Sequence, residues 1–105
     1  MANDIITVLR KAPGEPWEVD TVVNELHALQ KAVGGYIEVV TLVPGVVVIC
    51  DEEGRLYDRP FNCEIAGIGF VGTILIAGVD GEEFCDVPDD VIGAFVGETG
   101  DYFEI

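Results

Sequence analysis

The stretch from Leu29 to Glu38 reads L-Q-K-A-V-G-G-Y-I-E, and its structural period changes in the middle. Apolar residues before and within its first half recur at helical spacing: Val22, Leu26, Leu29 and Val33. Gly34 then stands where a left-handed C-terminal cap belongs, because glycine adopts a positive φ without steric cost. A β-branched run follows the second glycine. The stretch therefore predicts a helix that passes directly into a strand.

The expected helix begins at Asp20, whose side chain can cap the first turn, and ends at Gly34. The expected strand covers residues 36–42. A helix and a strand joined by two glycines fold back on each other, so Leu29 and Val33 should pack against Tyr36 or Ile37.

Other strand-like runs lie on both sides of this junction. They cover residues 4–9, 17–19, 46–50, 72–79 and 82–87. Pro44-Gly45 has the type II turn signature, and Asp80-Gly81 is a hairpin signal. We further expect residues 51–54 to turn and residues 55–57 to pair back. Residues 88–95 should form a short helix that begins at Pro88, with Asp89 and Asp90 in its first turn.

These elements predict one α+β domain over residues 1–105. We expect a small, mostly antiparallel sheet with one main helix packed on a face and a short C-terminal helix. The tail, about residues 97–105, should be loosely held. A chain of 105 residues with half of them apolar can bury a real but small core.

The charge of the chain is large and unevenly placed. The net charge is −15, and all five basic side chains lie at or before Arg59: Arg10, Lys11, Lys31, Arg55 and Arg59. Binding to nucleic acid or to an anionic membrane is disfavoured, because both require Lys and Arg. A basic protein partner remains open.

The chain has neither an evident targeting segment nor an uninterrupted apolar run of the roughly 18 residues that a membrane helix needs. Its three cysteines are odd in number and widely spaced, which suits reduced thiols. These features predict a cytoplasmic protein.

Acidic side chains are densest in the predicted hairpin and short helix. They are Asp80, Glu82, Glu83, Asp86, Asp89 and Asp90. The sequence lacks the EF-hand loop pattern, so a solvated face is favoured over a cation site. Ordered elements would hold these charges in fixed positions, and we therefore predict a partner-binding acidic patch.

A second candidate is a ligand loop between strands. Its residues are Arg59, Phe61, Asn62, Gly67 and Gly69. Residues 67–72 match G-x-G-x-x-G, but they precede a strand-like run rather than a helix, so a loop before a strand is favoured over a dinucleotide-binding fold. A packed surface loop is the simpler interpretation of residues 59–63.

No catalytic arrangement or metal-ligand spacing stands out. His27 is the only imidazole, and with Cys50, Cys63 and Cys85 it lacks the C-x-x-C spacing of a zinc site. Thiol catalysis would require a tertiary coincidence. We expect no enzyme activity, cofactor or resident metal.

The block from Leu29 to Glu38 resembles the marker of a family of small uncharacterised proteins of phages, plasmids and their bacterial hosts. Residues 50–54 (C-D-E-E-G), Gly72-Thr73 and residues 80–82 (D-G-E) are similar as well. The resemblance covers roughly residues 4–95. It implies an accessory protein of a mobile element and transfers no catalytic residue.

Two functions from different classes follow. The first is an acidic interaction protein that binds a basic surface of a host protein, in the sharpest version by mimicking DNA. The alternative is a protein that binds, and so sequesters, a small ligand or nucleotide signal. Adaptation to a salty cytoplasm is a weaker explanation of the acidity. A homodimer could form if residues 46–50 or 73–79 were an exposed strand edge.

Overall fold

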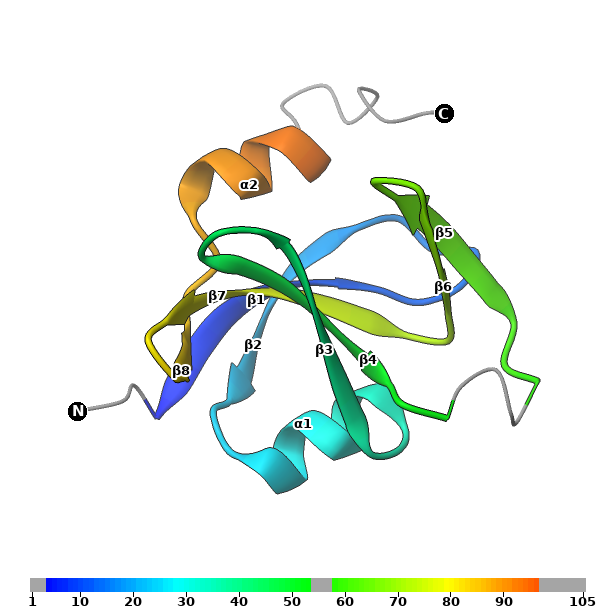
Figure 1. The fold of residues 1–105 in the computed structure, drawn as a ribbon, viewed down its shortest axis with the longest axis horizontal. Coiled ribbons are helices and arrows are strands. Elements are labelled where there is room, and N and C mark those ends of the chain that lie inside the picture. The colour runs from blue at the N-terminus through cyan, green and yellow to red at the C-terminus, as the bar shows by residue number, and fades with distance from the viewer. Residues whose placement is uncertain (1–3, 54–57, 97–105) are drawn as a thin grey trace.

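The computed structural model describes residues 4–53 and 58–96. This part of the chain contains eight strands and two helices (Figure 1). In chain order they are β1 (Ile5–Lys11), β2 (Glu18–Val23), α1 (Leu26–Val33), β3 (Ile37–Val43), β4 (Val46–Asp51), β5 (Phe61–Ile65), β6 (Ile68–Val71), β7 (Ile74–Asp80), β8 (Glu83–Cys85) and α2 (Asp89–Phe95).

The strands form a six-stranded sheet and a separate two-stranded one. The large sheet has the order β2-β1-β7-β4-β3, and β8 also pairs with β7; the small sheet is the β5–β6 hairpin. Every pairing is antiparallel. The predicted α+β class and mostly antiparallel sheet are therefore confirmed.

β1 and β8 share one edge of β7. β1 pairs with residues 74–76 and β8 with residues 78–80. The chain just after β8 is tied to β1, since Val87 donates its N–H to the carbonyl of Thr7 at 2.9 Å. Gly78 permits this crowding, because a Cβ there would lie 2.4 Å from the carbonyl oxygen of Asp86.

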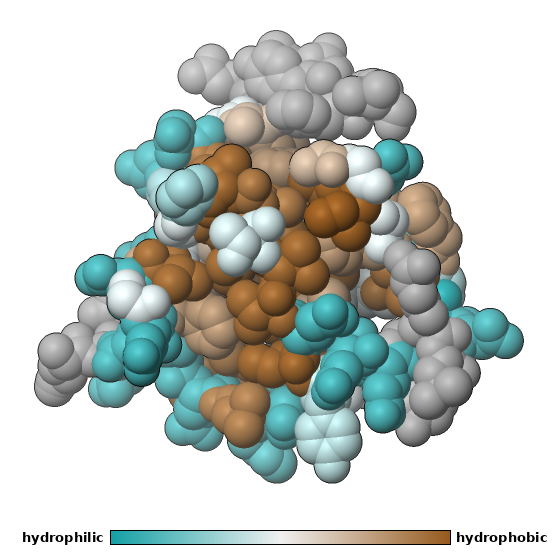
Figure 2. Space-filling model, viewed as in Figure 1, coloured by the Kyte–Doolittle hydropathy of each residue, from teal (hydrophilic) through white to brown (hydrophobic). Residues whose placement is uncertain are grey.

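Apolar residues of the sheet pack into two clusters. Successive residues of β4 enter different clusters, Val47 and Ile49 in one and Val46 and Val48 in the other, because side chains alternate between the faces of a strand. All six residues of β4 are buried. Figure 2 shows apolar side chains gathered across the centre of the view, where Figure 1 draws β3 and β4.

The two helices are short and contact different clusters. Leu29 and Val33 of α1 belong to the first cluster, whereas Val91 and Phe95 of α2 are partly buried against the second. α1 has eight residues and α2 has seven, so strands dominate the domain and the expectation of one main helix is not confirmed.

The start of α1 differs from the prediction, whereas its end agrees. Asp20 and Val22 lie in β2, because Thr21, Val22 and Val23 are β-branched and pair with β1. The N-cap is Glu25, whose side chain makes no cap hydrogen bond, and the C-cap Gly34 has the expected left-handed φ of 89°.

Several other expectations are wrong. Residues 61–63 and 68–71 are strands rather than loops, and they are joined at Ala66 and Gly67, which have φ of 53° and 82°. Positive φ at both central residues is typical of a tight type I′ hairpin. β4 and β7 are interior strands, so neither offers a free edge for dimerisation.

Two expectations fall on parts of the chain that the structure does not describe. They are the returning pairing of residues 55–57 and the loosely held tail at 97–105. Among the described residues, no helix reaches the length and apolarity needed to cross a membrane.

Candidate functional site

A buried ion pair lies where β4 ends. The side chain of Asp51 is only 2% exposed, and its Oδ2 accepts the Nε–H of Arg59 at 2.5 Å. Its Oδ1 accepts the backbone N–H of Glu53 at 3.0 Å. Both oxygens are therefore bonded, as a buried carboxylate requires.

The two glycines after α1 lie directly against this pair. Arg59 donates from Nη2 to the carbonyl oxygen of Gly34 at 2.7 Å. A Cβ on Gly35 would lie 2.7 Å from Oδ1 of Asp51, closer than real Cβ contacts. A Cβ on Gly72 would lie 2.9 Å from Cδ of Arg59. The absence of a side chain at Gly35 and Gly72 therefore leaves room for the ion pair, whereas Gly34 has the left-handed φ that ends α1.

A pocket of about 540 Å³ opens beside this arrangement. It is lined by Gly34, Gly35, Asp51 and Arg59 together with His27, Gln30, Lys31, Tyr36 and Glu53. His27 and Lys31 are four residues apart on α1, and both are exposed. Tyr36 is 66% exposed, so its ring is available at the rim.

The charge of the pocket differs from that of the protein. The walls carry Lys31 and Arg59 against Asp51 and Glu53, and they also hold the only histidine of the chain. With His27 neutral these charges cancel, whereas the whole chain has a net charge of −15. A molecule that carries negative charge meets less repulsion here than over the acidic hairpin.

The residues of the predicted ligand loop do not converge. Arg59 lines this pocket, whereas Phe61 and Asn62 line a second pocket of about 910 Å³ with Trp17 and Phe95. Gly67 is part of the β5–β6 turn, and Gly69 lies within β6.

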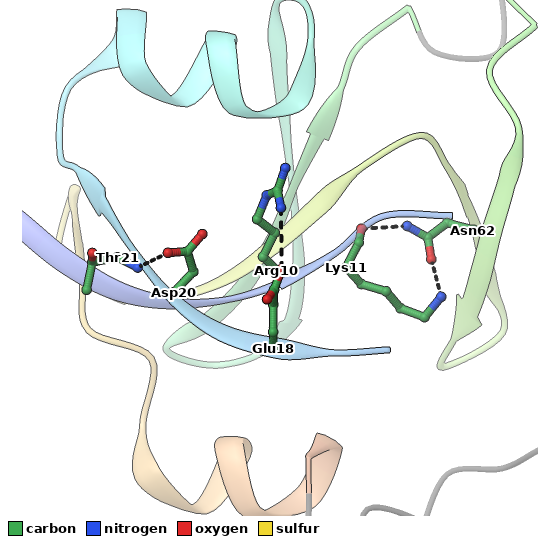
Figure 3. Close-up of polar contacts among 6 residues, drawn as sticks. All are labelled: Arg10, Lys11, Glu18, Asp20, Thr21 and Asn62. Atoms are coloured by element: carbon green, nitrogen blue, oxygen red, sulfur yellow. Dashed lines mark hydrogen bonds and ion pairs between the residues drawn. The ribbon is translucent and has the colours of Figure 1, made fainter. Parts of the chain in front are cut away.

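Asn62 has a structural role that explains its burial. Its Oδ1 accepts a hydrogen bond from Nζ of Lys11 at 2.8 Å, and its Nδ2 donates to the backbone carbonyl of Lys11 at 2.8 Å (Figure 3). Nδ2 also donates to the carbonyl of Gly72 at 2.7 Å. Asn62 therefore fastens the β5–β6 hairpin to β1.

The predicted acidic patch is on the surface. Asp80 and Glu83 stand opposite each other in the β7–β8 register. Glu82, Asp89 and Asp90 are exposed, the last two in the first turn of α2.

Asp86 differs from the other acidic residues because its Oδ1 accepts the backbone N–H of Thr7 at 2.8 Å. One of the six predicted residues therefore also holds β1 to the chain after β8.

The cysteines do not form a site with one another. Burial raises the pKa of the Cys63 thiol, and the nearby Lys11 partly offsets this effect. Burial raises the pKa of Cys85 as well, and the charges of Asp80 and Asp86 add to the shift. Within residues 4–53 and 58–96, no three His, Cys, Asp or Glu side chains gather as metal ligands do.

Sequence reasoning missed most of the pocket, including Lys31, Tyr36 and Asp51. A signal for them was present. Lys31 and Tyr36 belong to the Leu29–Glu38 block, and Asp51 is the first charged residue after a wholly apolar strand. Of the residues assigned to the predicted ligand loop, only Arg59 lines this pocket.

The fold and pocket define a small α+β domain with an antiparallel sheet and an open polar pocket beside α1. The chain belongs to the family described as a domain of unknown function, DUF3846, which it matches over residues 6–100. No curated protein and no solved structure matches it.

Proposed function

We propose that the protein is a non-catalytic binding protein that holds a small polar ligand in the pocket between α1 and Arg59. One observation carries the proposal: the guanidinium of Arg59 is fixed at the pocket wall by both Asp51 and the carbonyl of Gly34. A preorganised donor loses little conformational entropy when a ligand arrives.

The other walls supply complementary chemistry. Lys31 offers a mobile ammonium group, Glu53 offers a carboxylate, and the exposed ring of Tyr36 offers a flat apolar surface. A pocket of about 540 Å³ falls in the range that small-molecule sites occupy. An anionic molecule with a planar group fits this set, and a nucleotide signal is a member of that class.

Ligand-induced stabilisation tests the proposal. The protein would be screened by thermal shift against mononucleotides, cyclic nucleotides and small carboxylates. We expect at least one compound to raise Tm, because a ligand that binds only the folded state stabilises it. Lys31→Gln and Tyr36→Ala should each weaken the effect at least several-fold.

Arg10→Gln is the matched control, because it also removes one positive charge but from an ion pair with Glu18 outside the pocket. A screen without any shift would overturn the proposal, as would a ligand whose binding is equally sensitive to Arg10→Gln.

The acidic patch supports a second candidate function, binding to a basic surface of a host protein. The supporting observation is that Asp80 and Glu83 are paired across a hairpin while Asp89 and Asp90 are set in a helix turn. Regular elements of this kind hold charges at fixed spacing, which DNA mimicry needs. The resemblance to proteins of phages and plasmids supports an accessory role of this type on a mobile element.

Neutralising the patch tests this second function. A variant with Glu82→Gln, Glu83→Gln, Asp89→Asn and Asp90→Asn should lose binding to a purified basic partner while keeping the circular dichroism spectrum of the parent. Binding should also weaken steeply as salt rises, because screening reduces the attraction. Unchanged binding by the variant would show that the acidity serves solubility alone.

A further inference from the structure

Within residues 4–53 and 58–96, nothing pairs with the outer edge of β3, so its outward backbone groups face away from the sheet. The backbone carbonyl of Tyr36 accepts the N–H of Glu52 at 2.7 Å, which sets the phase of the β3–β4 ladder. Antiparallel strands alternate, so the backbone groups of residues 38 and 40 point to β4 and those of Val39 and Thr41 point outward. β3 is the last strand of the sheet in the described part of the chain.

The opposite edge of the sheet, β2, is protected. The N–H of Asn24 donates to the carbonyl of Asp4 at 2.8 Å, so the backbone groups of Thr21 point outward by the same rule. The N–H of Thr21 is occupied by Oδ1 of Asp20 at 2.8 Å (Figure 3). Charged side chains on an edge strand discourage pairing with another chain, and β2 carries both Glu18 and Asp20.

From Ile37 to Thr41, β3 has little such protection, and its ladder with β4 is irregular only beyond that run, between Thr41 and Val43. Its sequence, I-E-V-V-T-L-V, contains one charge and no proline. Val39 and Val43 are 44% and 53% exposed. The chain as a whole has a net charge of −15, yet this edge strand is nearly uncharged. We therefore expect its open edge to pair with another strand.

We propose that β3 pairs antiparallel with β3 of a second copy of this chain, about a two-fold axis at Val40. In this register Val39 lies opposite Thr41 of the second copy. Both residues present outward backbone groups, so each pair forms two hydrogen bonds. This proposal is independent of the ligand pocket.

Charge repulsion disfavours the register that has its axis at Val39 instead of Val40. With the axis at Val40, Glu38 lies opposite Leu42 of the second copy, and the two Glu38 residues are four positions apart, roughly 13 Å along the strands. With the axis at Val39, the hydrogen bonds also match in phase, but the two Glu38 residues would be only two positions apart, about 7 Å along the strands. Like charges that close are repulsive.

The same physics predicts an unusual salt dependence. Two chains of the same strong negative charge repel each other, and salt screens that repulsion. Dimerisation through β3 should therefore strengthen as ionic strength rises. Binding of the acidic patch to a basic partner has the opposite dependence.

Sedimentation velocity over a concentration series, at low and high salt, tests the proposal. We expect a monomer–dimer equilibrium whose dissociation constant falls when salt is raised. Thr41→Pro should weaken the dimer at least tenfold, because it removes an N–H that points outward and is not used within the β3–β4 ladder.

Thr21→Pro is the matched control, being the same substitution at an outward-facing position of the other edge, and it should leave the dissociation constant unchanged. If either proline variant fails to fold, Val39→Glu replaces it as the test. Because it adds a charge to the interface at an exposed position, it should raise the dissociation constant of the dimer. A monomer at every concentration and salt would overturn the proposal. So would a dimer unaffected by both Thr41→Pro and Val39→Glu.

Discussion

Arg59 and Asp51 form a hydrogen-bonded ion pair, 2.5 Å from Nε to Oδ2, that joins the segment before β5 to the end of β4. Through the bond from Nη2 to the carbonyl of Gly34, the same guanidinium also holds the end of α1. The end of α1, the end of β4 and the segment before β5 therefore meet at one side chain. This is why Arg59 bears on both stability and the shape of the pocket.

Removing the arginine should be costly. Arg59→Met leaves the buried Asp51 carboxylate without its counter-charge. We expect the free energy of unfolding to fall by about 2–4 kcal/mol. This is less than the loss for a fully buried ion pair, because Arg59 is partly exposed. Urea denaturation at neutral pH measures it. The double variant Arg59→Met with Asp51→Leu should recover much of the loss, because no unpaired charge remains.

Arg10→Met provides the comparison for that experiment. Arg10 pairs with Glu18 at 3.4 Å on the surface, and such pairs contribute about 0–1 kcal/mol. Equal losses for Arg59→Met and Arg10→Met would contradict the role assigned to Arg59.

The second glycine of the block should not tolerate a methyl group. Gly35→Ala places a Cβ 2.7 Å from an oxygen of Asp51 that is already hydrogen-bonded. We expect about 1–3 kcal/mol of destabilisation from overpacking. Gly93→Ala is the contrast, since it lies inside α2 with no atom within 4 Å of the added Cβ, and it should stabilise by roughly 0.5–1 kcal/mol. Thermal unfolding that gave the two changes the same sign would refute this account.

Local signals in the sequence predicted local structure well. The positive φ of Gly34, the Pro44-Gly45 turn and the Asp80-Gly81 hairpin each depend on residues within one turn, and each is present. The start of α1 was predicted wrongly because Val22 fits a helical period and a β-strand equally well, and pairing with β1 decides between them.

Contacts between residues far apart in the chain could not be predicted from the sequence. The strand order β2-β1-β7-β4-β3 depends on pairings between distant residues, and no local pattern specifies them. The pocket depends on the same kind of contact, because Gly34 and Arg59 are 25 positions apart. The role of Asn62 was likewise invisible, since its partner Lys11 lies 51 positions away.

Asn62 should be one of the most sensitive polar positions. Asn62→Ala removes the donor to the carbonyls of Lys11 and Gly72 and the acceptor of the Lys11 ammonium. Buried groups left without a partner cost about 1–3 kcal/mol each, so we expect a loss of roughly 2–4 kcal/mol. Asn24→Ala, which removes a single bond to the carbonyl of Phe84, should cost about 1 kcal/mol. Chemical denaturation that ranked Asn24 above Asn62 would contradict this assignment.

Cys63 should react slowly and give stability a specific pH dependence. Because burial raises its pKa in the folded protein, the thiolate fraction at pH 8 is lower than for an ordinary cysteine, and iodoacetamide should modify it more slowly than it modifies the unfolded chain. The unfolded state releases this proton first as pH rises. The thiol therefore leaves stability unchanged below the unfolded pKa and lowers it between the unfolded and the raised folded pKa.

Cys63→Ala should remove the part of the alkaline loss of stability that this thiol causes.

Salt should change the alkylation rates of Cys63 and Cys85 in opposite directions. At Cys85, salt screens the carboxylate charges that help raise the thiol pKa, so salt should speed alkylation. At Cys63, salt screens the Lys11 charge that lowers the thiol pKa, so salt should slow alkylation. Peptide mass spectrometry after timed alkylation measures both sites at once, and a Cys63 thiol that reacts as fast in the folded protein as in urea would disprove the prediction.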